Sequence, residues 1–237
     1  MRACFLFVTE IVYLCEMMER LVILFIVVLG AMSVGAVDYD GKFSSLGFVD
    51  VHQLDSTIVI DLKYSGTDNF MGVNMYGDLR KAYLQPEIAD RLLKAQQLLR
   101  EKSNDYTLVV YDAARPLSAQ KIMFDKVQGT EFEQYVANPY NGGGHHCYGC
   151  AVDVTILYKG EPLDMGTGFD SFSEVSHTDN EQANLANGTL TQEAYQNRLL
   201  LRGVMTAVGF EVEPCEWWHF SCYKIEYVRE KFPRLDF

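Results

Sequence analysis

The chain has 237 residues, of which 49% are hydrophobic and 22% charged, and its formal net charge is −12. This composition indicates a globular protein with room for one sizeable domain, and it excludes a disordered chain. An acidic surface repels phosphates, so we expect no nucleic-acid partner. The sequence contains no internal repeat and no recognisable domain linker.

The N-terminal segment has the pattern of a secretory signal peptide. An unbroken apolar run at residues 21–29 precedes Val34-Gly35-Ala36, which suits a signal-peptidase cut after Ala36. The run is too short to span a bilayer as a mature helix, so we expect no stable membrane insertion after cleavage. We therefore predict a signal peptide at residues 1–36 and a periplasmic or secreted mature domain at residues 37–237.

Alternatives remain for these first residues. Glu10 and Glu16 interrupt the stretch before the apolar run, so Met17 or Met18 is an alternative start of the protein. The run itself could also be an uncleaved anchor or a buried hydrophobic helix. N-terminal sequencing of the exported protein distinguishes these cases.

Export would place the mature chain in an oxidising compartment. Cys4 and Cys15 leave with the signal peptide, and four cysteines remain: Cys147, Cys150, Cys215 and Cys222. Four cysteines allow up to two disulfides, in any of three connectivities. A structural zinc site with four cysteine ligands is the alternative. A redox role for residues 147–150 is disfavoured, because such a motif opens a helix and a strand is expected to follow here.

The first half of the mature chain predicts two strands and one long helix. Residues 37–51 are mixed and turn-rich, residues 57–62 are β-branched and strand-like, and residues 65–80 resemble a long functional loop. A helix begins at Pro86, and its apolar stripe comprises Ile88, Leu92, Ala95 and Leu99. Residues 107–111 form a buried strand that Pro116 cannot continue, and a short helix starts near Leu117.

The second half predicts a loop, a strand and a second long helix. The segments are a glycine-rich loop at 139–150, a strand at 151–157, an extended loop at 160–190, a helix from Thr191 to Gly209, strands at 210–212 and 217–220, and a short terminal helix. Strands and helices are mixed without regular alternation. We therefore predict an α+β fold, a single domain with a largely antiparallel central sheet flanked by helices.

Two separated stretches supply the side chains of a metal site. Residues 144–153 hold His145, His146 and Asp153, and residues 216–219 hold Glu216 and His219. Two imidazoles and one carboxylate suit a catalytic zinc ion with three protein ligands and an open fourth position. A glutamate beside the metal can take a proton from water without being a ligand.

The metal-site hypothesis makes a structural demand at the second stretch. On a regular strand Glu216 and His219 would face opposite sides of the sheet, since side chains alternate. A bend, a bulge or a position at the start of the strand is needed to bring both to one metal ion. Taken singly, each histidine is more often an ordinary core or surface residue than a ligand.

The two stretches together resemble a known family signature. Gly144-x-His146-x-x-Gly149-x-Ala151-x-Asp153 followed by Glu216-x-Trp218-His219 is similar to Ser-x-His-x-x-Gly-x-Ala-x-Asp and Glu-x-x-His of zinc D-alanyl-D-alanine dipeptidases of the VanX type. Further similar stretches are Phe48-Val49-Asp50-Val51, Asp61-Leu62-Lys63-Tyr64 with Asn69-Phe70, Asp112-x-x-Arg115-Pro116, and Met165-Gly166-Thr167-Gly168-Phe169-Asp170. The resemblance covers residues 47–223 and implies the fold shared by D,D-peptidases and Hedgehog domains.

The resemblance implies a role for each matching residue and one zinc ion per chain. The zinc ligands would be His146, Asp153 and His219, while His145 has no assigned role. Glu216 would be the base that takes the proton of the attacking water and later protonates the leaving amine. Arg115 would stabilise the oxyanion, and Asp170 would bind the amino group of the substrate.

Two departures bear on substrate range. The serine that opens the family pattern is Gly144 here, so its polar contact is missing or replaced. The cysteines around the site are also unusual for the family. Both features leave the exact shape of the cavity open.

The sequence therefore predicts a zinc dipeptidase that cleaves D-Ala-D-Ala and similar small D,D-dipeptides, for cell-wall peptide recycling or glycopeptide resistance. One alternative is a D,D-carboxypeptidase or endopeptidase acting on peptidoglycan stem peptides. The other is a catalytically silent zinc-binding domain, which the retention of Glu216 argues against.

Overall fold

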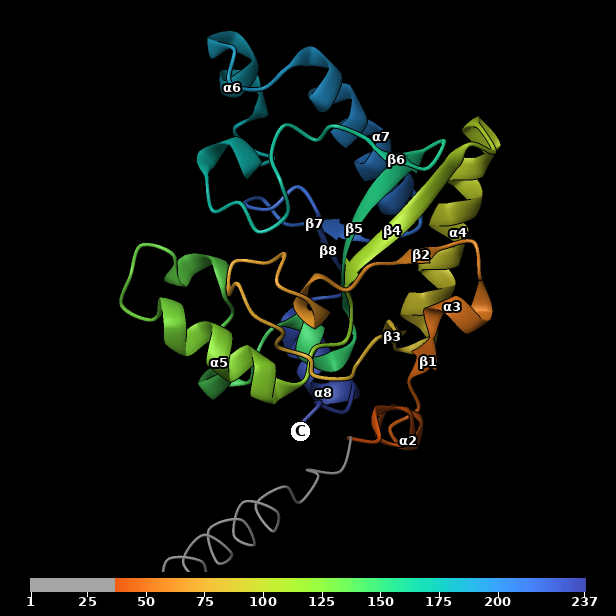
Figure 1. Ribbon diagram of the computed structural model, residues 1–237, viewed down its shortest axis with the longest axis vertical. Helices are drawn as coiled ribbons and strands as arrows, with labels where there is room; N and C mark the ends of the chain where they lie inside the picture. Colours follow the sequence, from red (N-terminus) through yellow and green to blue (C-terminus); the bar gives the residue numbers. More distant parts are fainter. Residues whose placement is uncertain (1–36) are drawn as a thin grey trace, which may run out of the picture. The chain divides into compact units, whose positions relative to one another are not determined.

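The computed structural model describes residues 37–237 of the chain (Figure 1). The predicted signal peptide at residues 1–36, with Cys4 and Cys15, lies outside the described residues. Within the described part of the chain, Asp38–Phe237 form one compact unit. No helix in that part is long and apolar enough to cross a bilayer.

One mixed sheet forms the centre of the fold. Its path follows the order β2 (Val59–Ile60), β4 (Tyr106–Asp112), β5 (Ala151–Tyr158), β8 (His219–Ser221) and β7 (Glu211–Val212), and β6 (Glu161–Pro162) pairs with β5. Only β2 and β4 are parallel, and every other pairing in this sheet is antiparallel. A separate two-stranded sheet joins β1 (Val49–Asp50) to β3 (Tyr83–Leu84). The predicted α+β fold with a largely antiparallel sheet is confirmed.

Two long helices pack beside this sheet. Helix α4 (Pro86–Lys102) buries all four residues of the predicted apolar stripe, and it packs against β4 and α7 (Gln192–Ala207). The Thr191 side chain accepts a hydrogen bond from the backbone N–H of Ala194 at 3.0 Å, which caps α7 as predicted. In Figure 1, α4 and α5 (Leu117–Val127) lie on opposite sides of the long strands β4 and β5.

Three sequence predictions about local structure were wrong in part. Residues 37–51 include the helix α2 (Tyr39–Ser45), and residues 160–190 include the helix α6 (Glu181–Asn187). The strand expected at 57–62 is only the two-residue β2. The other α-helices in the described part of the chain are α3 (Val51–Leu54) and α8 (Ile225–Lys231).

Helix α6 escaped prediction because its buried side chains are polar. It buries Glu181 and Asn184, so it has no apolar stripe with helical spacing. Helix α2 buries one side chain, Phe43, and depends on the Asp38 carboxylate, which accepts a hydrogen bond from the Gly41 N–H at 2.9 Å. A single buried residue leaves no periodic signal in the sequence.

The sheet brings three chain segments to one end of its long strands. Strand β4 ends at Asp112, where the antiparallel β5 has just begun and β8 starts at His219. Residues 151–156 of β5 are all buried, so this strand is enclosed on both faces. The candidate site lies at this end of the sheet.

Candidate active site

The first two candidate ligands face each other across one pair of strands. Asp153 of β5 and His219 of β8 are register partners in the antiparallel ladder. Their side chains leave the same face of the sheet, because directly opposite residues do so. The Nδ1 atom of His219 lies 3.0 Å from Oδ1 of Asp153.

The third candidate ligand, His146, comes from the turn that leads into β5. Its backbone carbonyl accepts a hydrogen bond from the Arg115 N–H at 2.9 Å. Its Nδ1 lies 2.6 Å from the carbonyl oxygen of Ala113 and must donate there, because a carbonyl only accepts. The Nε2 atom then faces His219 Nδ1 at 3.1 Å and Asp153 Oδ1 at 3.3 Å, and it is the ring nitrogen that could bind a metal ion.

The signature glycine allows this turn to pack closely. Gly149 has φ +65° and ends the short 3₁₀ turn His145–Tyr148. A Cβ atom at this position would lie 2.3 Å from the ring of Phe48. Both the left-handed backbone and the close approach therefore require glycine.

The three donor atoms have the spacing that a tetrahedral metal ion requires. They form a triangle with edges of 3.0, 3.1 and 3.3 Å. Ligand bonds of about 2.0–2.1 Å in tetrahedral geometry separate donor atoms by roughly 3.3 Å. Among the described residues, His146, Asp153 and His219 are the cluster of side chains able to hold a metal ion. Two imidazoles and one carboxylate suit a borderline cation such as zinc.

The electrostatics around Asp153 favour its ionised form. Burial alone would raise the pKa of this carboxyl, but the adjacent imidazoles of His146 and His219 outweigh burial and hold the pKa well below its usual range. An ionised carboxylate is the form that binds a cation.

The side chain of Glu216 reaches the three candidate ligands from a turn. It precedes β8, and the N–H of His219 donates to the Glu216 carbonyl at 3.3 Å. This turn removes the strict alternation that would have separated the two side chains. Glu216 Oε2 lies 3.9 Å from His219 Nδ1. Burial raises the pKa of the Glu216 carboxyl well above its usual range, and the charges of Asp153 and Asp170 raise it further.

A bulge in β4 places a further carboxylate beside the site. Val110 pairs with Val154, yet Asp112 pairs with Asp153, so β4 holds one extra residue at this point. Bulges of this kind redirect side chains and are frequent next to active sites. Asp112 is fully buried there and accepts a hydrogen bond from the Tyr76 hydroxyl at 2.5 Å.

Asp112 holds Arg115 in place. The Nε and Nη2 atoms of Arg115 donate to Asp112 Oδ2 at 2.9 and 2.7 Å, and Nη1 donates to Gln120 at 2.9 Å. The guanidinium also lies 4.9 Å from the ring centre of Tyr64 and 3.8 Å from Asp153 Oδ2. These contacts fix a permanent positive charge beside the three candidate ligands.

Asp170 faces the site from a loop. It has φ +58°, a conformation that is uncommon for aspartate. Its Oδ1 accepts a hydrogen bond from the Tyr64 hydroxyl at 2.9 Å, and its Oδ2 accepts one from the Phe70 N–H at 3.1 Å. Burial raises the pKa of this carboxyl to about 7, despite the two hydrogen bonds, which lower it.

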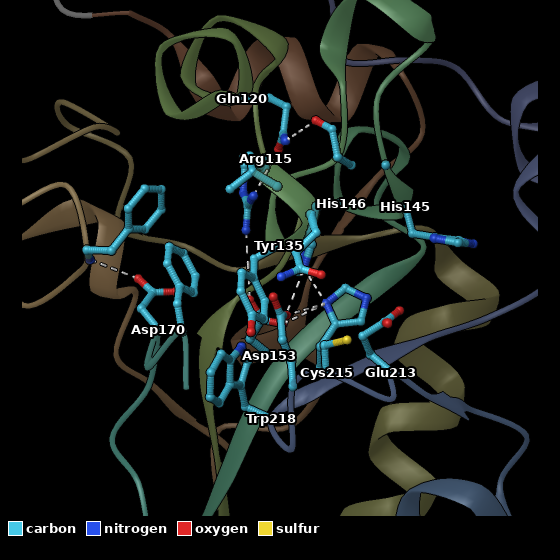
Figure 2. A pocket seen from close by; sticks show the side chains of 18 of the residues that line it. Arg115, Gln120, Tyr135, His145, His146, Asp153, Asp170, Glu213, Cys215 and Trp218 are labelled. Atoms are coloured by element: carbon cyan, nitrogen blue, oxygen red, sulfur yellow. Dashed lines mark hydrogen bonds and ion pairs between the residues drawn. The ribbon is translucent and has the colours of Figure 1, made fainter. Parts of the chain in front are cut away.

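All six predicted site residues line one cavity of about 200 Å³: Arg115, His146, Asp153, Asp170, Glu216 and His219. Figure 2 shows Asp170 at the left of this cavity, Arg115 above, and His146 with Asp153 in the middle. Aromatic side chains of Tyr64, Phe70, Tyr135, Phe172 and Trp218 form much of the remaining wall. The volume lies below the roughly 300–1,000 Å³ of pockets for drug-sized ligands, so it suits a small substrate.

His145 also lines the cavity but is placed differently from His146. Its Nε2 lies 3.0 Å from the carbonyl oxygen of Tyr223 and donates to it. Burial lowers the pKa of its imidazole to about 4. His145 is therefore neutral at neutral pH, and its Nε2 is engaged away from the metal triangle.

Sequence reasoning assigned no role to Asp112 or Tyr64. Both hold another site residue in place, Asp112 by binding Arg115 and Tyr64 by binding Asp170. The signals were present, because each residue lies in a stretch that resembles the family. The role of Tyr64 depends on a contact with a segment 106 residues away. Asp112 and Arg115 are only three residues apart, but their contact depends on the bulge in β4 that directs Asp112 toward the site, and a motif specifies neither.

Glycine at position 144 is explained by packing. A Cβ atom there would lie 2.8 Å from Cβ of Ala137. A serine would therefore force Ala137 and its loop outward. Both residues line the cavity. Glycine at position 144, where the family pattern has serine, therefore allows the loop that carries Ala137 to lie close to it at the cavity wall.

The cysteines around the site are thiols in the structure. In the described part of the chain Cys147, Cys150, Cys215 and Cys222 are all free, so the expected disulfides are not formed. Cys150 and Cys222 lie beside each other across β5 and β8, where the Cys222 N–H donates to the Cys150 carbonyl at 2.9 Å. Cys215 instead lines the cavity.

Comparison with known proteins gives a consistent result. A family model described as D-ala-D-ala dipeptidase, peptidase M15, matches residues 44–235. The D-alanyl-D-alanine dipeptidase of Escherichia coli strain K12 is 35% identical, covering 73% of this chain and 83% of that protein. The dipeptidase of the same name from Enterococcus faecium is 31% identical over 74% of this chain and 91% of its own length. That from Streptomyces coelicolor is 30% identical over 73% and 90%.

Proposed function

The chain belongs to the D-Ala-D-Ala dipeptidase family of metallopeptidases, and on this premise we propose that it hydrolyses D-Ala-D-Ala to two molecules of D-alanine with one zinc ion per chain. The observation that carries the proposal is the triangle of donor atoms from His146, Asp153 and His219, beside a free carboxylate, in a cavity of about 200 Å³. The small volume favours a dipeptide over a longer peptide.

The metal and Glu216 have complementary tasks in this reaction. A zinc ion held by His146, Asp153 and His219 would supply a Lewis acid that can activate water and polarise the scissile carbonyl. The Glu216 carboxylate accepts the proton of the attacking water and delivers it to the departing amine. Its raised pKa suits both steps, because a weakly acidic carboxyl holds the proton until the C–N bond breaks. A nearby cation lowers this pKa toward the working range.

Arg115 and Asp170 bind the charged parts of the reacting molecule. The Arg115 guanidinium, held by Asp112, lies where it can stabilise the negative charge that develops on the carbonyl oxygen. Asp170 can bind the ammonium group of the dipeptide, since its carboxylate lines the cavity across from the metal ligands (Figure 2). A dipeptide bound at its amino terminus would have its single peptide bond near the three candidate ligands.

We further propose that the mature enzyme acts outside the cytoplasm on dipeptides derived from the cell wall. The apolar run at residues 21–29 and the small residues before position 37 support a signal peptide and export. In an oxidising compartment Cys150 and Cys222 are the pair positioned to form a disulfide, because paired antiparallel neighbours lie about 5.5 Å apart at Cα. Mass spectrometry of the exported protein with and without reductant tests this pairing.

The central experiment measures metal content and hydrolysis on the same purified protein. We expect one zinc ion per chain and release of D-alanine from D-Ala-D-Ala, with both lost on chelation and restored by zinc. A stem pentapeptide should not be cleaved. Preferential cleavage of the pentapeptide would instead assign a D,D-carboxypeptidase activity, and zinc binding without any hydrolysis would leave only a binding domain.

A further inference from the structure

The loop that carries Asp170 has little regular structure of its own. We call residues 164–176 the Asp170 loop; they connect β6 to α6 and include only one short 3₁₀ turn, Glu174–Ser176. Asp170 lies near the middle of this loop in a left-handed conformation. Such a conformation is unfavourable for aspartate and persists only where the surroundings impose it. Some contact outside the loop must therefore hold its shape.

Arg198 of helix α7 joins the two ends of the Asp170 loop. Its Nε donates to the carbonyl of Met165 at 2.7 Å, and its Nη1 donates to the carbonyl of Val175 at 3.0 Å. The two carbonyls are ten positions apart, with Asp170 midway between them. A single planar guanidinium thus closes the base of the loop, which a flexible ammonium could not do at both points.

Arg198 is well placed to act as a rigid anchor. Only 2% of its surface is exposed, and its charge is balanced by Glu181, whose Oε1 lies 3.6 Å from Nη1. The next residue toward the N-terminus, Asn197, donates to the carbonyl of Asp164 at 2.8 Å. Helix α7 therefore holds the loop through three side-chain hydrogen bonds to its backbone.

Contacts inside the loop transmit this anchoring to its middle. Ser176 Oγ donates to the carbonyl of Ser171 at 2.7 Å and lies 2.9 Å from Thr167 Oγ1. Thr167 Oγ1 also accepts a hydrogen bond from Trp217 Nε1 at 2.9 Å. These hydrogen bonds join the segments of the loop before and after Asp170 to each other, in addition to the two contacts that Arg198 makes at the ends of the loop.

We propose that Arg198 is a positioning residue for substrate binding, which fixes the carboxylate of Asp170 at the place where the ammonium group of the dipeptide binds. The inference rests on the proposed function, because it assigns Asp170 to that ammonium group. Arg198 does not line the cavity, so it acts on the substrate only through the loop.

The test compares Arg198→Lys with a matched change on the same helix. Arg202 binds the same buried partner, with Nη2 2.8 Å from Glu181 Oε2, but it donates no hydrogen bond to the Asp170 loop. Arg202→Lys therefore perturbs the shared ion pair without touching the loop. Arg198→Gln, which keeps an amide donor without charge, replaces the lysine variant if that protein does not fold.

We expect Arg198→Lys to raise KM for D-Ala-D-Ala about 10-fold or more while kcat changes less than about 3-fold and zinc content is unchanged. The preference for D-Ala-D-Ala over its N-acetyl derivative should shrink by a similar factor, because the lost contact is specific to the free ammonium. A purely structural role would lower stability and leave this preference intact. Arg202→Lys should keep both the wild-type KM and the wild-type preference.

Hydrogen exchange gives a readout that needs no activity. Amides of residues 166–174 should exchange faster in Arg198→Lys than in the wild type or in Arg202→Lys. An unchanged KM and N-acetyl preference in Arg198→Lys, or an equal KM rise in Arg202→Lys, would overturn the inference. If the wild-type protein does not cleave the dipeptide, the proposed function fails, and unchanged exchange in Arg198→Lys would separately refute the anchoring of the loop.

Discussion

The two walls of the cavity are built in different ways. The metal wall, made of His146, Asp153, Glu216 and His219, rests on β5, β8 and the turns that enter them. The substrate wall, made of Tyr64, Phe70, Tyr135, Asp170 and Phe172, lies on loops and short turns. Strand pairing fixes the first wall, whereas side-chain contacts between distant loops fix the second.

This difference determines how each wall tolerates change. A strand register is all or none, because a shift by one residue moves a side chain to the other face. The position of a loop changes gradually as single hydrogen bonds are lost. We therefore expect changes in the metal wall to abolish the reaction and changes in the substrate wall to weaken substrate binding.

The largest effect should follow from His219→Ala. Loss of one of three ligands should remove the metal ion and lower kcat/KM by at least about 1,000-fold, because the activated water is lost with it. Zinc analysis and hydrolysis of D-Ala-D-Ala check both results. Ser221→Ala, on the same strand, is the control and should keep metal and activity. Full zinc occupancy in His219→Ala would remove this residue from the ligand set.

Glu216→Gln should separate catalysis from metal binding within the same wall. The amide keeps the shape of the side chain but cannot accept the proton of water, so kcat should fall about 100- to 10,000-fold with zinc retained. Glu213→Gln is the matched control, since Glu213 also lines the cavity three residues earlier. A larger loss in the control would assign the base to Glu213 instead.

Arg115→Ala tests the charge that lies beside the metal wall. We expect a loss of about 2.7–4 kcal/mol in transition-state stabilisation, seen in kcat/KM, with zinc content unchanged. Asp112→Asn should give a smaller loss of the same kind, because it weakens the contact that holds the guanidinium. If Asp112→Asn does not change kcat/KM, the contact between Asp112 and Arg115 is not needed to position the guanidinium.

The substrate wall should show its own pH dependence. The pKa of Asp170 is raised to about 7 by burial, so this carboxyl becomes neutral as the pH falls through that value. A metal cation bound nearby would lower this pKa and move the transition to lower pH. Affinity for the dipeptide should then drop by up to tenfold per pH unit on the acid side. Binding measured in the Glu216→Gln background separates the titration of Asp170 from that of Glu216, the proposed catalytic base.

Two further variants check the origin of this acid-side loss. Asp170→Asn should bind weakly at every pH and show no such transition. Asp164→Asn, an exposed change on the same loop, should bind as the parent protein does. An acid-side loss that survives in Asp170→Asn would place the titrating group elsewhere.

The smallest effect should come from Tyr135→Phe. The Tyr135 hydroxyl lies 2.9 Å from His177 Nε2, and its ring stacks on Phe172 at 4.8 Å between centroids. Phenylalanine keeps the stacking and loses one hydrogen bond, so we expect about 0.5–1.5 kcal/mol of lost stability and a rise in KM of a few-fold. Thermal unfolding and steady-state kinetics measure the two. A fall in kcat with unchanged KM would contradict the division between the two walls.

Much of the metal wall could be predicted from the sequence. Asp153 and His219 stand in motifs that lie on two paired strands, and His146 stands in the turn that leads into the first of them. The structure brings their donor atoms within 3.3 Å of one another. The position of Glu216 could not be predicted, because on a regular strand its side chain would point away from that of His219. The turn before β8 brings both side chains to the same side, and such a turn leaves no clear pattern in the sequence.

The sequence alone determined the elements with strong local signals: the stripe of α4, the cap of α7 and the strand β5. The resemblance to a known family indicated the candidate ligands of the metal wall. Only the tertiary structure decided that Asp112 orients Arg115, that Tyr64 and Phe70 hold Asp170, and that Arg198 closes the base of its loop. Local patterns record backbone periodicity and burial. The contacts of Asp170 and Arg198 join segments more than twenty residues apart and depend on how the whole chain packs. The Asp112–Arg115 contact is local in sequence but depends on a bulge in β4, so no simple local pattern encodes any of these contacts.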